Sequence, residues 1–234
     1  IHDDLLIAHR FMRLQINEED KPLAPVVNLH NEPDRGYSVV RVCTWDRAGL
    51  FAKMAGSLSA VGLTILSAQI FTRSDGIALD TFYVTDAVSG KLATVMQRDE
   101  FEKLLTRVLS GEPVDLHRLI AQQRISRPLY YAYTGEQIPT QIVFDNEMSD
   151  SRTFVEVETE DRIGLLYTIA STLAELEVDI STARILTEKG AAIDSFYVRE
   201  LDGGKILSPE RQKAIERRLA HAINNLGSNN GSSA

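Results

Sequence analysis

The chain has 234 residues, which is enough for one large domain or two of ordinary size. Its net charge of −8, from 25 basic and 33 acidic residues, argues against a nucleic-acid surface, because such a surface needs a basic face. No apolar run approaches the roughly 20 residues of a membrane span. The single cysteine, Cys43, excludes an intrachain disulfide framework and fits a reducing cytoplasm.

Residues 1–25 are expected to form an N-terminal helix followed by a linker. Apolar side chains recur there at helical spacing, at Leu6, Ile7, Phe11 and Leu14. His2-Asp3 and His9 are metal-ligand types, but no further His or Asp at useful spacing completes a coordination sphere, so we expect no metal site. The sequence does not begin with Met, and two alternatives stay open: a fragment of a longer protein and a complete chain.

The rest of the chain contains one pattern twice. Asp46-Arg47-x-Gly49-Leu50 returns as Asp161-Arg162-x-Gly164-Leu165, and Asp80-x-Phe82-Tyr83-Val84 returns as Asp194-x-Phe196-Tyr197-Val198. The second copy is one residue shorter at a turn, which is where a chain tolerates a lost residue. This repetition predicts two domains, 26–110 and 141–226, with a linker at 111–140 and a disordered tail at 227–234.

Each copy is predicted to hold the same six elements. In the first copy these are strands at 26–30 and 37–45, a helix from residue 50 to 61, a hairpin of strands at 63–73 and 77–85, and a helix at 98–109. Asp46 and Asp161 stand where an N-cap is wanted, and Gly62 stands where a helix ends.

The fold class is therefore α+β. Each unit is expected to be ferredoxin-like, with an antiparallel four-stranded sheet and two helices on one face. The second unit has no strand after its last helix, so we expect its opening strand to fill the vacant sheet position. The order then becomes a permuted ββαββα.

The segment between the units carries two further features. Residues 113–124 are expected to extend the last helix of the first unit. Tyr130, Tyr131 and Tyr133 form an aromatic cluster beside Arg124 and Arg127. Such a cluster can stack on a nucleic-acid base, but the acidic balance of the chain favours packing against a neighbouring surface.

The pattern D-R-x-G-L, a helix, G-L-x-I-x-x-A-x-I-x-T, a turn and A-x-D-x-F-Y-V resembles an ACT domain. In tandem, it is most similar to the C-terminal region of the bacterial PII-protein uridylyltransferase/uridylyl-removing enzymes. The resemblance implies a glutamine-sensing regulatory region that is not itself catalytic, with the PII protein as a partner only through the longer enzyme. It also implies ACT units paired edge to edge, within the chain or in a homodimer, with ligand at the seam.

The expected ligand site is the start of each first helix, where free N–H groups suit the carboxylate of an amino acid. Asp46, Asp161, Thr64 or Asp179 would take the ammonium, although Asp179 is also expected to repel a nearby carboxylate. The alternative is that the aspartates are only caps and the glycines only allow close packing. The candidate residues are Asp46, Arg47, Ala48, Gly49, Leu50, Leu63, Thr64, Ile65, Asp161, Arg162, Ile163, Gly164, Leu165, Val178, Asp179 and Ile180.

No catalytic residue is expected in this chain. Gly56-Ser57 lies inside a predicted helix without the Asp-x-Asp pair that a nucleotidyltransferase needs, and there is no phosphate-binding loop or triad spacing. No cofactor is expected either, because the resemblance places magnesium in the catalytic domain of the longer enzyme. Two alternatives stay open: a stand-alone tandem ACT sensor that acts through a partner protein, and an RNA-binding α+β module.

Overall fold

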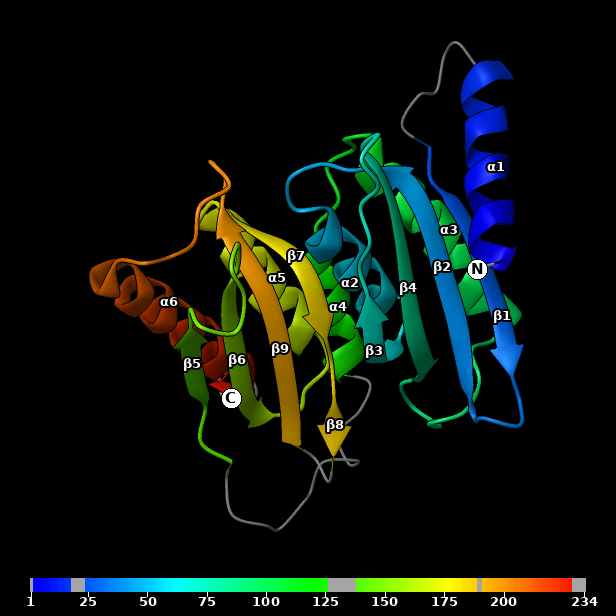
Figure 1. Cartoon of the computed structure of the whole chain (residues 1–234). Coiled ribbons are helices and arrows are strands. Elements are labelled where there is room, and N and C mark those ends of the chain that lie inside the picture. The colour runs from blue at the N-terminus through cyan, green and yellow to red at the C-terminus, as the bar shows by residue number, and fades with distance from the viewer. Residues whose placement is uncertain (1, 18–23, 126–137, 189–190, 229–234) are drawn as a thin grey trace.

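The computed structural model describes residues 2–17, 24–125, 138–188 and 191–228, and they form two similar α+β units that pack against each other (Figure 1). The first unit is preceded by α1 (His2–Asn17). It contains β1 (Val26–Glu32), β2 (Tyr37–Trp45), α2 (Leu50–Ala60), β3 (Leu63–Gln69), β4 (Ile77–Asp86) and α3 (Val95–Leu109). After α4 (Leu116–Ile125), the second unit contains β5 (Gln141–Asp145), β6 (Thr153–Glu160), α5 (Leu165–Glu175), β7 (Val178–Arg184), β8 (Thr187–Glu188), β9 (Ala191–Glu200) and α6 (Pro209–Ser228).

The sheet topology confirms the permuted ββαββα order. The first sheet runs β1-β2-β4-β3 and the second β5-β6-β9-β7, with every pair antiparallel. The opening strands β1 and β5 therefore occupy the edge position that a closing strand would take. The second sheet differs from the expected four strands, because the short β8 also pairs with β9. The corresponding place in the first unit holds only an isolated bridge between Thr72 and Ala78.

Several element bounds differ from the sequence predictions. β3 ends at Gln69 rather than at residue 73. Helix α3 begins at Val95, because Thr94 and Gln97 form a reciprocal capping box that the apolar periodicity does not reveal. Helix α6 continues to Ser228, so the predicted tail begins as helix. The aromatic cluster at 130–133 and the remaining tail residues lie outside the described ranges.

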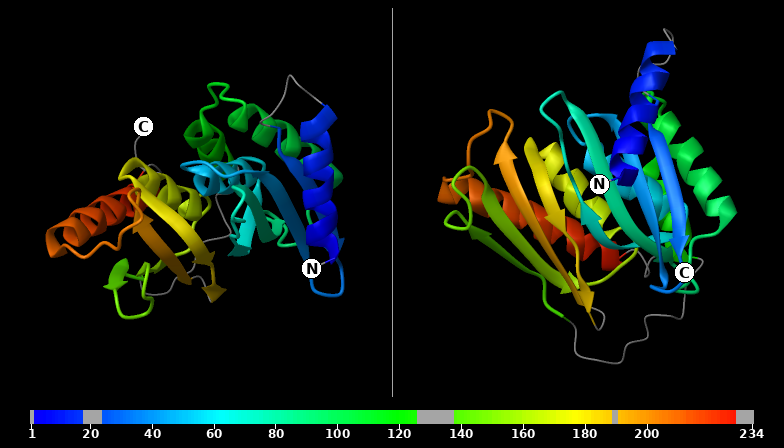
Figure 2. Two further views of the ribbon diagram at one scale, coloured as in Figure 1. Left: turned by 45° about the horizontal axis from the view of Figure 1, so that its top comes forward. Right: turned by 45° about the vertical axis from the view of Figure 1, so that its right-hand side comes forward.

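Helix α4 does not extend α3 as predicted. It is a separate helix that packs on α2, and α2 also packs on α5 (Figure 2). Gly56 permits this close approach, since a Cβ atom there would lie 2.7 Å from Cδ2 of Tyr167 and 2.9 Å from Cδ1 of Leu116. The two units consequently share one continuous hydrophobic core, to which α2 and α5 both contribute.

Helix α1 covers the opposite face of the first sheet, across β1 and β2, in a second, smaller core. Phe11 is fully buried there, with its ring edge-on to Trp45 at 5.7 Å between centroids. Cys43 is buried beneath α1 as a small apolar residue, and burial raises the pKa of its thiol to about 12. No helix within the described ranges is long and apolar enough to cross a membrane.

Candidate functional site

The helix after each repeated Asp-Arg-x-Gly-Leu turn begins without a side-chain cap. Gly49 is the N-cap of α2 with φ of 71°, and Gly164 is the N-cap of α5 with φ of 78°. Both lie in the left-handed region, which glycine adopts without the steric cost that a Cβ brings. The prediction that Asp46 and Asp161 cap these helices is wrong, because the glycine three positions later takes the cap position.

The missing cap leaves hydrogen-bond donors free at the start of α2. The N–H of Leu50 donates to the carbonyl of Arg47, and the N–H of Lys53 donates to the carbonyl of Gly49, both at 3.1 Å. No residue in the described part of the chain accepts a hydrogen bond from the N–H of Phe51 or Ala52. Two free donors and the positive end of the helix dipole make this an attractive position for an anion.

Each turn meets an edge strand of the other unit, because β3 and β7 lie next to each other at the seam. The first seam pocket combines Asp46, Arg47, Gly49 and Leu50 with Val178, Asp179 and Ile180 of β7. The second seam pocket combines Asp161, Arg162, Ile163, Gly164 and Leu165 with Leu63, Thr64 and Ile65 of β3. Of the sixteen candidate residues, Ala48 alone lines neither pocket.

The two seam pockets differ greatly in size. The first has a volume of about 540 Å³ and the second about 30 Å³. Pockets for small molecules commonly measure roughly 300–1,000 Å³, whereas 30 Å³ holds only one or two waters. Ile163 lines the second pocket where the first unit has the small Ala48. Only the first seam pocket has room for an amino acid.

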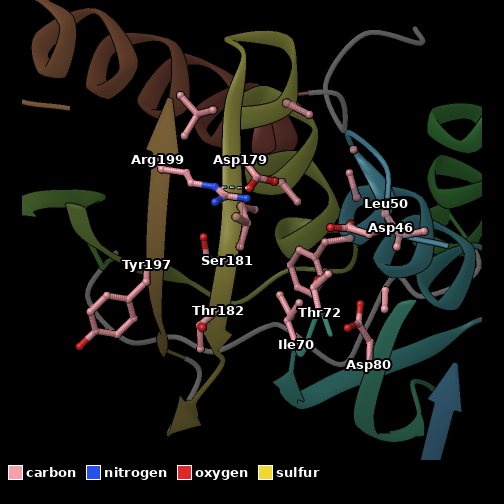
Figure 3. Close-up of a pocket in the computed structure, with 18 of the residues that line it drawn as sticks. Asp46, Leu50, Ile70, Thr72, Asp80, Asp179, Ser181, Thr182, Tyr197 and Arg199 are labelled. Carbon is pink, nitrogen blue, oxygen red and sulfur yellow. Dashed lines mark hydrogen bonds and ion pairs between the residues drawn. The ribbon is translucent and has the colours of Figure 1, made fainter. Parts of the chain in front are cut away.

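The β7 wall of the first seam pocket carries charge. Nε of Arg199, on the neighbouring β9, lies 2.8 Å from Oδ2 of Asp179 (Figure 3). Nε of Arg152 donates to Oγ of Ser181 at 2.7 Å. Arg199 therefore offsets the charge of Asp179, so the expected repulsion of a carboxylate by Asp179 is weakened. The wall presents both donors and acceptors to a ligand.

The arginines of the repeated motif have structural partners. Arg47 donates to the carbonyl of Leu109 at 2.9 Å and to Oγ1 of Thr44 at 3.1 Å, and burial lowers the pKa of its guanidinium. Arg162 instead pairs with Glu160 at 2.7 Å. Arg47 thus ties the first turn to the end of α3, which leaves its donors little freedom to bind a ligand.

The sequence reasoning did not select two buried carboxyl groups beside the pockets. Asp80 lines the first seam pocket and Asp194 lines the second. Both residues are only 1% exposed. Burial raises the pKa of Asp80 to about 7 and that of Asp194 to about 8, with the nearby Asp46 and Asp161 respectively adding to the effect. The available signal was an aspartate inside the same apolar strand pattern in both copies.

Comparison with known proteins agrees with this fold. Residues 141–226 match a family model described as "ACR9-like, ACT-like domain". The first unit has the same strand order and the same motif, so the chain carries two ACT-like domains in tandem. An aspartate kinase from Synechocystis overlays on 80% of this chain and 27% of its own, at 12% identity and a TM-score of 0.41, which is too distant to support a functional argument.

The sequence relatives are more informative. The chain is 34% identical over 199 residues to a bifunctional uridylyltransferase/uridylyl-removing enzyme of Ruegeria pomeroyi, and 35% identical over 219 residues to that of Azospirillum brasilense. These matches cover 84% and 92% of this chain but only 21% and 22% of the relatives, so the chain spans about a fifth of their length. It resembles the C-terminal regulatory region of these enzymes.

Proposed function

We propose that this chain is the glutamine-sensing region of a uridylyltransferase/uridylyl-removing enzyme and that it has no catalytic activity of its own. The catalytic domain of that enzyme would hold the magnesium and act on the PII signalling protein. The open first seam pocket carries this proposal, because it joins free helix N–H groups to a polar strand wall in a space large enough for an amino acid.

The position of the pocket suggests how binding would be transmitted. Its walls come from both units, so a ligand that contacts α2 and β7 together favours one relative arrangement of the units. Binding shifts a conformational equilibrium only by the difference in affinity for its states. A seam pocket provides this difference, because its shape changes whenever the units move.

Isothermal titration calorimetry of the purified chain tests the proposal. We expect L-glutamine to bind with a stoichiometry of one per chain, since only one seam pocket is open. Thr182→Phe places a ring in the first seam pocket and should abolish binding. The matched control is Ser67→Phe, at the equivalent position of β3, which lines neither seam pocket and should leave binding intact.

Two results would count against this function. If neither glutamine nor another amino acid binds, the sensing role is removed and a partner-protein role becomes the better explanation. If both phenylalanine variants bind glutamine as the unmodified chain does, the ligand lies outside the first seam pocket. Circular dichroism of each variant shows whether the fold is retained.

A further inference from the structure

Asp80 is a buried acid with one unused oxygen. It lies in the middle of β4, opposite Val42 of β2, and its Oδ1 accepts a hydrogen bond from the N–H of Phe71 at 3.2 Å. No residue in the described ranges donates to its Oδ2. Burying a carboxyl group without a cation or a full set of donors is unfavourable, so a partner for this oxygen would stabilise it.

Asp80 and its counterpart in the second unit, Asp194, face pockets of different size. Asp194 holds the same place in β9, opposite Val157, and no described residue forms a hydrogen bond with its Oδ1. Asp194 faces only the small second seam pocket, whereas Asp80 faces the large first one. The same buried acid thus lines a pocket with room for a ligand in the first unit and one too small for a ligand in the second.

No described residue supplies a cation to the carboxyl group of Asp80. Asp46 lies on the same wall and adds negative charge, while Arg47 is engaged by Leu109 and Thr44. The nearby Cys43 thiol is on the outer face of β2, and α2 contributes only apolar residues to the pocket. The Asp179–Arg199 pair lies on the β7 side, opposite Asp80 and Asp46 in Figure 3. Arg152 also lines the first seam pocket and donates a hydrogen bond to Ser181 of β7.

We propose that Asp80, with Asp46 beside it, receives the ammonium group of the bound amino acid. The assignment rests on the proposed function and deepens it. The ligand's carboxylate then reaches the free N–H groups of α2, and its side chain extends toward β7. The first seam pocket therefore selects ligands that carry a free, positively charged amino group next to a carboxylate.

This arrangement makes binding dependent on pH. Because burial raises the pKa of Asp80 to about 7, most of the group is protonated at pH 6 and must release its proton to receive an ammonium. Apparent affinity falls in proportion to the fraction in the competent state. We expect glutamine to bind roughly five- to tenfold more tightly at pH 7.5 than at pH 6.

The test compares L-glutamine with its des-amino analogue, 5-amino-5-oxopentanoate, which keeps the carboxylate and the carboxamide. On the unmodified chain, we expect the analogue to bind at least tenfold more weakly. Asp80→Asn should weaken glutamine binding by a similar factor and abolish its pH dependence. Asp194→Asn, the matched control in the small second seam pocket, should leave both unchanged.

Equal affinity for glutamine and the analogue would overturn the ammonium assignment while leaving amino-acid sensing in place. Unchanged glutamine binding by Asp80→Asn would overturn it as well. The analogue and pH measurements need only the unmodified chain, so they decide the question even if Asp80→Asn does not fold. If glutamine does not bind the unmodified chain at all, the proposed function fails first and this assignment fails with it.

Discussion

Replacing Asp194 with asparagine is expected to remove a pH dependence from the stability of the chain. The asparagine oxygen can still accept the hydrogen bond that Leu186 donates to Asp194, and it carries no ionisable group. In the folded chain, burial raises the pKa of Asp194 to about 8, against an ordinary value of 3.8 in the unfolded chain. Between these values the folded chain holds a proton that the unfolded chain has released.

The sign and size of the effect follow from proton linkage. Because folding takes up one proton in this window, the free energy of unfolding falls as the pH rises. Each pH unit corresponds to about 1.4 kcal/mol for one proton. Relative to Asp194→Asn, the unmodified chain should therefore lose about 3 kcal/mol of stability between pH 5 and pH 7.

Urea denaturation followed by circular dichroism, repeated from pH 5 to pH 7, measures this difference. Subtracting the free energy of unfolding of Asp194→Asn from that of the unmodified chain removes two contributions. These are any effect of the asparagine that does not change with pH, and the titration of groups that both proteins share. Asp34→Asn, at an exposed position in the turn between β1 and β2, controls for the loss of one formal charge. A difference between Asp194→Asn and the unmodified chain that does not change with pH would refute a buried, protonated Asp194.

Three further substitutions test the fold. Glu177 follows α5 in the left-handed region with φ of 58°, where the first unit has Gly62. Glu177→Gly should therefore stabilise the chain by about 0.5–1 kcal/mol, measured as a higher urea midpoint, and Gly62→Ala should lower that midpoint. A lower midpoint for Glu177→Gly together with a higher one for Gly62→Ala would contradict the strain argument. Phe11→Ala removes a fully buried ring from the α1 core at a cost of about 3–5 kcal/mol, which should release α1 from the sheet. Trp45 is the only tryptophan, so its fluorescence should move to longer wavelength, and an unchanged spectrum would show that α1 stays docked.

Local patterns were sufficient for most of the fold. Alternating residues at 153–159 predict a strand with one wet face, and β6 has that alternation of buried and half-buried positions. Gly62 predicts the end of α2, and it has the positive φ that such an end requires. The permuted strand order is predictable because the second copy has no strand after its last helix, and the repeat extends the same order to the first copy.

The N-cap residues of α2 and α5 could not be predicted from the sequence. Aspartate is a good N-cap in general, but a left-handed glycine can take that position without any side-chain hydrogen bond. Which residue takes the N-cap position depends on how the turn packs against the sheet, and local residue preferences do not predict that packing. The burial of Asp80 and Asp194 was hidden for a related reason, because a strand pattern shows which face a residue occupies but not what covers that face.

The sequence by itself determined that the chain holds two copies of one α+β unit with a glycine turn before each first helix. Those features depend on contacts between residues near one another in the chain, and their periodicity is visible in the residues. Only the tertiary structure decided that each turn faces the other unit's edge strand, and that one seam pocket is open while its counterpart is nearly filled. These properties arise where α2 packs on α5 and β3 approaches β7, so they depend on side-chain volumes that meet across the seam rather than on any repeated motif.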